Sequence, residues 1–164
     1  MPTIPPLALS VRQPWAWAII HAGKDVENRS AAAIRNMDLP DIRLPLRIAI
    51  HAAKGLTRAE YESARDFMAG IGVTCPPPDM LLRGGIIGSV EVAGIVSQHP
   101  SKWWMGPRGL LLRHPEACTF RPVTGALGLF RWTDGSYDIV PKAAKWMTAR
   151  PAAPAPPAPP PALL

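Results

Sequence analysis

The segment from Lys24 to Arg29 carries an ammonium, a carboxylate and a guanidinium close together in the sequence. If Val26–Arg29 is extended, Glu27 and Arg29 project to the same face, because side chains alternate along a strand. These groups, near the Lys24 ammonium, could activate a water or a ribose hydroxyl, or stabilise a developing oxyanion. The alternative is an ion-pair cluster at the surface, which contributes little to stability.

Lys24 itself has two readings. As a functional group it contacts a phosphate or a substrate carbonyl, or acts as a general base once neutral. The nearby carboxylates of Asp25 and Glu27 favour the charged ammonium, which opposes the role of base unless the site is desolvated. The alternative is a surface lysine that interacts with the C-terminal end of a preceding helix.

Two polar pairs outside this segment could bind a nucleic acid. Arg12 could hold a phosphate with two hydrogen bonds, and Gln13 could read the edge of a base. The alternative for Arg12 is a structural role in bonding loop carbonyls. His51 and Lys54 lie at the end of a predicted strand, where they could contact a phosphate, and His51 could act as an acid or base. A lone histidine in such a place is more often a structural residue with satisfied hydrogen bonds.

Tryptophans supply candidate stacking surfaces for unpaired bases, each stack contributing roughly 1–3 kcal/mol. Trp15 stands next to the Arg-Gln pair and is a better candidate than Trp17, although so apolar a helix tends to bury both rings. Trp103 and Trp104 follow a lysine in a loop between two prolines. One of these two rings is expected to plug the core, which leaves the other for stacking.

The elements that must position these residues are those of a small barrel. Short apolar segments separated by Gly and Pro predict an α+β barrel of about five to six strands with two to three flanking helices. Gly88 and Gly94 predict bulges or sharp bends, and residues 30–45, interrupted by prolines, are expected to form a loop. The predicted strands cover Leu7–Val11, Val26–Arg29, Leu46–Ala52, Gly85–Gln98, Gly109–Arg113 and Leu127–Trp132, with Phe120–Val123 as a further candidate.

Two helices are predicted from their start and stop signals. The helix over Pro14–Ala22 has a proline in its first turn and a glycine after its last. It is apolar nearly all round and should be substantially buried. The helix over Thr57–Met68 begins with a capping-box pattern, in which the Thr57 hydroxyl and the Glu60 carboxylate satisfy backbone N–H groups of the first turn.

The net charge of +6 favours a nucleic acid or another anionic partner. Lys142, Lys145 and Arg150 account for half of this charge and no acid lies beyond residue 140, which leaves +3 for residues 1–140. We read residues 1–140 as one domain. Residues 141–164 are read as a Pro- and Ala-rich tail, disordered or extended, that could contact another protein.

Several classes of protein are excluded by motifs that the sequence lacks. There is no Walker loop, no G-x-G-x-x-G after a strand, no G-x-S-x-G elbow and no H-E-x-x-H. The four histidines are scattered and the two cysteines form no C-x-x-C pair, so we expect no metal site and no cofactor. With neither a signal peptide nor an apolar run long enough for a membrane span, a cytoplasmic protein with reduced thiols is expected.

The segment LSVRQPWAWAIIHAGKDVENRS resembles the N-terminal signature of the ASCH (ASC-1 homology) family. That signature is a strand, an R-Q-P-aromatic entry to a helix, and then G-x-K-x-x-E-x-R, here Gly23–Arg29. The IAIHAAK strand end and the segments GGIIGSVEVAGIV and GALGLFRW are similar to later strands of the family. The resemblance covers roughly Leu7–Trp132.

The resemblance implies a PUA-like barrel that interacts with RNA or a modified nucleoside. Some members hydrolyse the acetyl amide of N4-acetylcytidine, and others are associated with cleavage of single-stranded RNA. The amidohydrolase members use Lys-x-x-Thr with a distant Glu, whereas this chain has Lys24-x-x-Glu27, so the nucleophile position holds a carboxylate. Attack by a water, with Glu27 as base and Lys24 as oxyanion partner, remains open.

We therefore expect a hydrolase acting on RNA or acetylated cytidine, with Lys24 and Glu27 as its catalytic residues in a basic, solvent-open cleft. A non-catalytic nucleic-acid-binding module and a small-nucleotide sensor are the alternatives. The residues expected to bind the substrate are Arg12, Gln13, Trp15, Arg29, His51, Lys54, Trp103 and Trp104.

Overall fold

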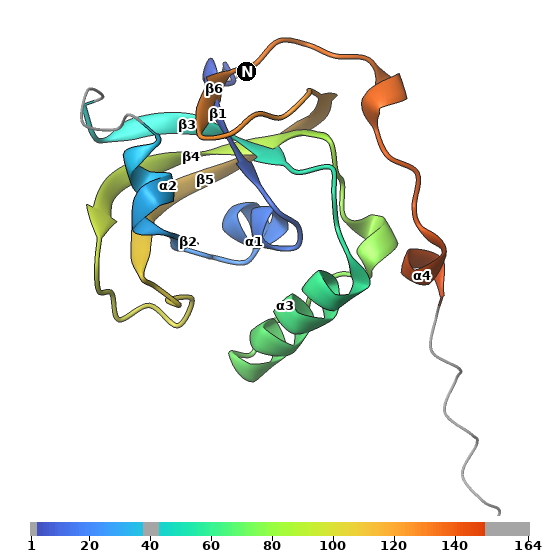
Figure 1. Ribbon diagram of the computed structural model, residues 1–164, viewed down its shortest axis with the longest axis horizontal. Coiled ribbons are helices and arrows are strands. Elements are labelled where there is room, and N and C mark those ends of the chain that lie inside the picture. Colours follow the sequence, from blue (N-terminus) through green and yellow to red (C-terminus); the bar gives the residue numbers. More distant parts are fainter. Residues whose placement is uncertain (1–2, 38–42, 150–164) are drawn as a thin grey trace, which may run out of the picture.

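A computed structural model describes residues 3–37 and 43–149 (Figure 1). They form one six-stranded mixed sheet, in the order β2-β5-β4-β3-β1-β6, which curls into a half-barrel flanked by helices. This confirms the expected α+β fold with a small barrel-like sheet. The strands are β1 (Leu7–Val11), β2 (Val26–Arg29), β3 (Leu46–Ala52), β4 (Gly85–Val96), β5 (Arg108–Pro122) and β6 (Leu129–Arg131). The helices are α1 (Trp15–His21), α2 (Ala31–Arg35), α3 (Arg58–Gly70) and α4 (Lys145–Thr148), with single 3₁₀ turns η2 (Pro78–Met80) and η3 (Tyr137–Ile139).

The pairing of β1 with β3 is parallel, whereas every other neighbouring pair in the sheet is antiparallel. The parallel register sets Ser10 opposite His51. The chain between these strands passes through α1, β2 and α2. The β1–β3 pair therefore brings a serine and a histidine together that lie far apart in the sequence.

The longest strand corrects the sequence prediction. Gly109–Arg113 and Phe120–Val123 were predicted as separate short strands, but Gly109–Arg113 and residues 120–122 belong to the single strand β5, which ends at Pro122. It pairs with β4 along nearly its whole length, with register shifts between Ile86 and Gly88 and between Val92 and Gly94. The expected bulges at Gly88 and Gly94 are thus confirmed, and they let a long antiparallel pair bend into a barrel wall.

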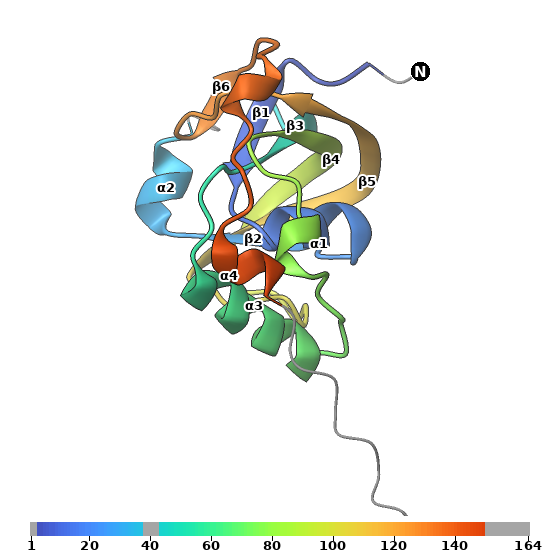
Figure 2. The same ribbon diagram turned by 90° about the vertical axis from the view of Figure 1, so that its right-hand side faces the viewer.

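Helix α1 packs against β3, β4 and β5 and lies within the curl of the sheet (Figures 1 and 2). Its Ala16, Ala18, Ile19 and Ile20 are buried, as its apolar sequence predicts. Gly23 follows the helix with φ +71°, a conformation that favours glycine and turns the chain toward β2. The end of α1 thus sets where Lys24 and β2 begin.

Helix α2 is a second correction, because residues 30–45 were expected to form a loop throughout. The Ser30 hydroxyl accepts a hydrogen bond from the Ala33 N–H at 3.0 Å and so caps Ala31–Arg35 as a short helix. In α3 the predicted capping box is confirmed, since Thr57 and Glu60 bond to each other's backbone N–H groups.

The C-terminal part of the described chain folds back beside α3 (Figure 2). Met147 of α4 is buried in a cluster with Leu56, Tyr61 and Leu81. Packing therefore continues past residue 140, where the domain was expected to end, while residues 150–164 of the predicted tail lie outside the described residues. Within residues 3–37 and 43–149, no helix has the length and apolar character to cross a bilayer.

Candidate functional site

The three charged groups of the Lys24–Arg29 segment lie together. Lys24 Nζ donates to Glu27 Oε2 at 3.1 Å and to the Val26 carbonyl at 2.5 Å. Glu27 Oε1 lies 3.5 Å from Arg29 Nε on the other side. Only 3% of Lys24 and 7% of Glu27 is exposed, so the surface ion-pair reading is wrong. We call these three residues the charged cluster; they carry two positive charges and one negative charge.

The fold positions the charged cluster through the alternation of β2. Val26 points into an apolar cluster with Ala18 and Met68, which fixes the strand and turns Glu27 to the opposite face. The Lys24 N–H bonds to the Ala18 carbonyl at 3.1 Å at the end of α1. The lysine and the glutamate are therefore held by two different elements that meet at Gly23.

Arg29 connects the charged cluster to β1. Its Nη2 donates to the Ser10 carbonyl at 2.9 Å. Its Nε is buried and makes no hydrogen bond to any described residue, although it faces the Glu27 carboxylate. Arg29 thus joins an edge strand of the sheet to a strand near the other edge.

Ser10 and His51 form a second polar unit next to this contact. The Ser10 hydroxyl lies 2.9 Å from His51 Nδ1, and His51 Nε2 lies 2.7 Å from the Val123 carbonyl. A carbonyl only accepts, so Nε2 carries the proton and Nδ1 accepts from the hydroxyl. Burial of the ring lowers the pKa of His51, in keeping with this neutral tautomer. A hydroxyl bonded to an oriented imidazole is the arrangement of an activated nucleophile.

Two separate cavities open near these units. One of about 200 Å³ is lined by Lys24, Asp25 and Arg113, and the other, of about 130 Å³, by His51, Lys54 and residues 123–125. They have no lining residue in common. The expected solvent-open groove is wrong for Lys24, Glu27 and His51, because no more than 7% of any of them is exposed. They are instead linked beneath the surface, through Arg29 and Ser10.

Arg12 and Gln13, expected to bind a nucleic acid, both bond to other parts of the fold, Arg12 at the exposed surface and Gln13 in the interior. Arg12 makes a two-fold contact with the Glu60 carboxylate of α3, with Nε to Oε2 at 2.8 Å. The Gln13 amide donates to the Leu82 carbonyl at 2.7 Å and accepts from the Trp17 N–H at 2.9 Å. Gln13 is therefore a buried helix cap, and Arg12 is a tether between the β1–α1 turn and α3.

Of the two tryptophans in the 101–107 loop, one is buried and the other is half-buried, as the sequence predicts. Trp103 is buried with Val26 and Met68 and plugs the core, whereas Trp104 is half-buried. The half-buried ring of Trp15 lies under Lys24, with Nζ 5.7 Å from the ring centroid. Trp15 thus belongs to the charged cluster's surroundings, and it gives the ammonium a cation–π partner.

Two side chains that bond to residues of the candidate site were missed by sequence reasoning. Ser10 gives no local signal of its role, because its contact with His51 depends on parallel strand pairing. Asn28 donates to the Trp103 carbonyl at 3.0 Å and accepts from the N–H groups of Met105 and Gly106 at 2.8 and 3.1 Å. Its place opposite Glu27 in the β2 alternation was the available signal that it faces the 101–107 loop.

The fold and these contacts define an α+β half-barrel protein with a buried, positively charged cluster at its edge strand. Across residues 3–37 and 43–149, no group of three or more His, Cys, Asp or Glu side chains is placed to hold a metal ion. The chain matches no protein-family model and no curated protein sequence. The resemblance to the ASCH family therefore stays a prediction from the sequence motifs between Leu7 and Trp132.

Proposed function

We propose that this protein is an ASCH-type hydrolase that acts on an unpaired nucleotide of RNA or on a modified nucleoside such as N4-acetylcytidine. The observation that carries the proposal is the buried Lys24–Glu27 contact at 3.1 Å, with Arg29 on its other side. Burying charged groups is costly. Such clusters are more common at sites that do chemistry than elsewhere.

The charge and size of the surroundings favour a single base or nucleoside. The charged cluster has a net positive charge, which suits a phosphate or a carbonyl oxygen that becomes negative. The cavity beside Lys24, of about 200 Å³, and the one beside His51, of about 130 Å³, are smaller than the roughly 300–1,000 Å³ of drug-sized sites. Bases within a duplex are stacked and inaccessible, so a single-stranded or free nucleoside fits best.

The chemistry follows from the three side chains. Glu27 accepts a proton from a water, whose oxygen attacks the acetyl carbonyl of the substrate. Lys24 and Arg29 face the oxygen that becomes negative and stabilise it. The proton then passes from Glu27 to the departing N4 amine as the C–N bond breaks. The products are acetate and cytidine, and Glu27 returns to its carboxylate form.

The test is a turnover assay with two carboxylate variants. Purified protein is incubated with N4-acetylcytidine, single-stranded RNA, duplex RNA and single-stranded DNA, and products are separated by liquid chromatography. Loss of a general base typically reduces the rate by about 10²–10⁴-fold, so Glu27→Gln should lose turnover. Glu116→Gln, which alters an exposed carboxylate paired with Arg47, is the matched control and should retain it. No product from the wild-type protein, or equal rates in both variants, contradicts the hydrolase.

The near-complete burial of Lys24 and Glu27 favours a second candidate, a nucleoside-binding module without catalysis. Such a protein needs only to admit and hold its ligand. It predicts saturable thermal stabilisation by nucleosides, since a ligand that binds only the folded state raises the melting temperature. Stabilisation that depends on Lys24, in the absence of product, assigns the chain to this second class.

A further inference from the structure

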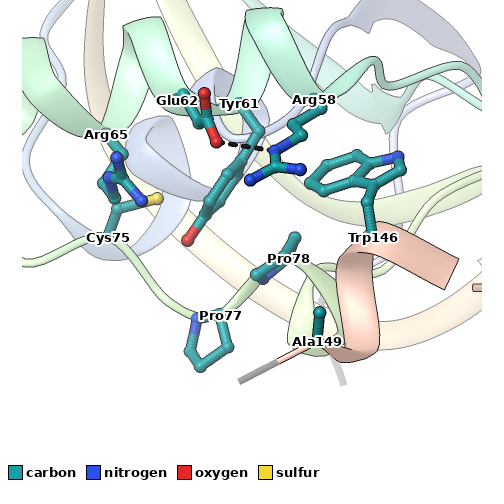
Figure 3. A pocket seen from close by; sticks show the side chains of 9 residues that line it. All are labelled: Arg58, Tyr61, Glu62, Arg65, Cys75, Pro77, Pro78, Trp146 and Ala149. Carbon is teal, nitrogen blue, oxygen red and sulfur yellow. Dashed lines mark hydrogen bonds and ion pairs between the residues drawn. The ribbon is translucent and has the colours of Figure 1, made fainter. Parts of the chain in front are cut away.

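A separate pocket of about 380 Å³ lies between α3 and the C-terminal helix α4 (Figure 3). It shares no lining residue with the cavities beside Lys24 and His51. Its volume falls within the range of roughly 300–1,000 Å³ that is typical of small-molecule sites. The side chains that matter here are Arg58, Tyr61, Arg65 and Trp146, which we call the α3–α4 pocket residues.

The aromatic walls of this pocket are held in place. Tyr61 is buried, and its hydroxyl donates to the Pro76 carbonyl at 2.7 Å. The Trp146 ring is half-buried, with its centroid 5.8 Å from that of Tyr61, and its neighbour Met147 anchors α4 in the core. Pre-positioned rings of this kind suit the stacking of a planar group, because little side-chain freedom is lost on binding.

The charges on the rim are arginines. Figure 3 shows Arg58 and Arg65 on either side of the Tyr61 ring, with Glu62 near Arg58. Glu62 is paired with Arg58 at 2.8 Å, and the Arg65 guanidinium lies 3.3 Å from the Asp66 carboxylate and 5.9 Å from the Tyr61 ring centroid. Both arginines are exposed, and the residues that line the pocket include these two guanidiniums and a single carboxylate. The side chains that line the pocket, two arginines and one glutamate, thus carry a net charge of +1, and its wall is aromatic.

We propose that the α3–α4 pocket binds a nucleoside phosphate, free or as one unit of a single-stranded nucleic acid. The base stacks on Trp146, and the phosphate lies between the guanidiniums of Arg58 and Arg65, which offer planar donor pairs suited to phosphate oxygens. The two guanidiniums favour this anionic ligand over a neutral proline-rich peptide, because such a peptide would contact the aromatic rings alone. The site is independent of the function proposed for the charged cluster.

The test is calorimetric titration of the whole chain with uridine, uridine monophosphate, a short single-stranded oligouridylate and inorganic phosphate. The monophosphate should bind at least about tenfold more tightly than uridine, because the phosphate contacts add to stacking. Arg65→Glu, a change at an exposed position, and Trp146→Ala should each weaken binding by roughly tenfold or more. Arg35→Glu, which changes an exposed arginine on α2, is the matched control and should leave the affinity unchanged.

Tighter binding of the oligouridylate than of the monophosphate identifies a nucleic acid as the source of the ligand, and equal binding identifies a free nucleotide.

Repeating the titration with the Glu27→Gln variant separates the two sites. Retained affinity in Glu27→Gln, with loss in Arg65→Glu, supports the α3–α4 pocket whatever the fate of the charged cluster. Loss of affinity in Glu27→Gln, with affinity retained in Arg65→Glu, overturns the proposal that the ligand binds the α3–α4 pocket. Equal affinity for uridine and uridine monophosphate overturns it as well, and so does binding of a Pro- and Ala-rich peptide in place of the nucleotide.

Discussion

The Arg29 guanidinium donates to the backbone carbonyl of Ser10 at 2.9 Å, although β2 and β1 are not neighbours in the sheet. The Ser10 side chain is in turn bonded to His51. This one residue therefore meets the charged cluster through its carbonyl and the histidine through its hydroxyl. Any ligand that moves Arg29 changes both units together, which makes this contact the first place to test the site.

Replacing Arg29 with Met should destabilise the protein. The change removes a charged donor from the Ser10 carbonyl and one cation from beside Glu27. Hydrogen bonds to charged groups contribute about 1.5–3 kcal/mol, so the free energy of unfolding should fall by about that amount. Urea denaturation measures the change. Arg131→Met, at an exposed position on β6, is the control and should stay within about 0.5 kcal/mol of wild type.

The two partners of the buried ion pair should differ in the cost of their removal. Lys24→Met leaves Glu27 facing Arg29, whereas Glu27→Met leaves two cations side by side with their shared carboxylate gone. Breaking a buried pair costs about 3–5 kcal/mol, and Glu27→Met should lie nearer the upper end than Lys24→Met. The double variant should cost less than the two single costs added together. Urea denaturation of all three proteins provides the comparison, and strictly additive costs would contradict the coupling.

The sequence predicts the strands that carry the charged cluster, because their apolar residues and their breakers are local signals. The course of β5 could not be predicted in this way. Its residues 113–117 are exposed: Arg113, Glu116 and Ala117 pair with β4, a contact distant in sequence, and His114 between them has a positive φ of 54°. Local pattern therefore finds a strand where burial dictates the side chains, and misses it where pairing alone does.

The same distinction applies to the site. Glu27 and Arg29 share a face because of strand alternation, so their meeting could be predicted. The contact of Ser10 with His51 required the parallel pairing of β1 with β3, which is set by tertiary packing. The burial of Lys24 could not be predicted either, since it depends on how α1 and β2 meet around Gly23.

The protein should become less stable as the pH falls below neutral, because burial lowers the pKa of His51 in the folded state. The unfolded chain binds the proton first, at a pKa of about 6.5. Stability is therefore full above that pH and is lost progressively as the pH falls toward the folded-state pKa. The loss is at most about 1.4 kcal/mol for each pH unit.

Urea denaturation between pH 5 and pH 8, as an approximate range around the histidine pKa, measures this dependence. His51→Gln should flatten the dependence in that range, even though it also lowers stability overall. His21→Gln, at an exposed position on α1, is the matched control. A wild-type stability that is constant over the range, or a His51→Gln variant with the wild-type slope, would contradict the assignment.

Ser10→Ala should separate two routes of catalysis. If water is the nucleophile, as proposed, the loss of the hydroxyl leaves turnover within about tenfold of wild type, whereas Glu27→Gln loses about 10²-fold or more. A loss in Ser10→Ala as large as that in Glu27→Gln assigns the attacking oxygen to Ser10, with His51 as its base. Ser10→Ala should lower the free energy of unfolding by only about 0.5–1.5 kcal/mol, because it removes one hydrogen bond between neutral groups.

Asn28 should control the order of the 101–107 loop. Its side-chain oxygen accepts from the N–H groups of Met105 and Gly106, and its amide donates to the Trp103 carbonyl. Asn28→Ala removes all of these contacts, so amide hydrogen exchange at Met105 and Gly106 should speed up by about tenfold, the equivalent of roughly 1.4 kcal/mol. Asn28→Asp keeps the acceptor for the Met105 and Gly106 N–H groups but loses the donor to the Trp103 carbonyl, so its protection should lie between those of Asn28→Ala and wild type. Equal protection in Asn28→Ala and wild type would show that the loop is held by the buried Trp103 ring instead.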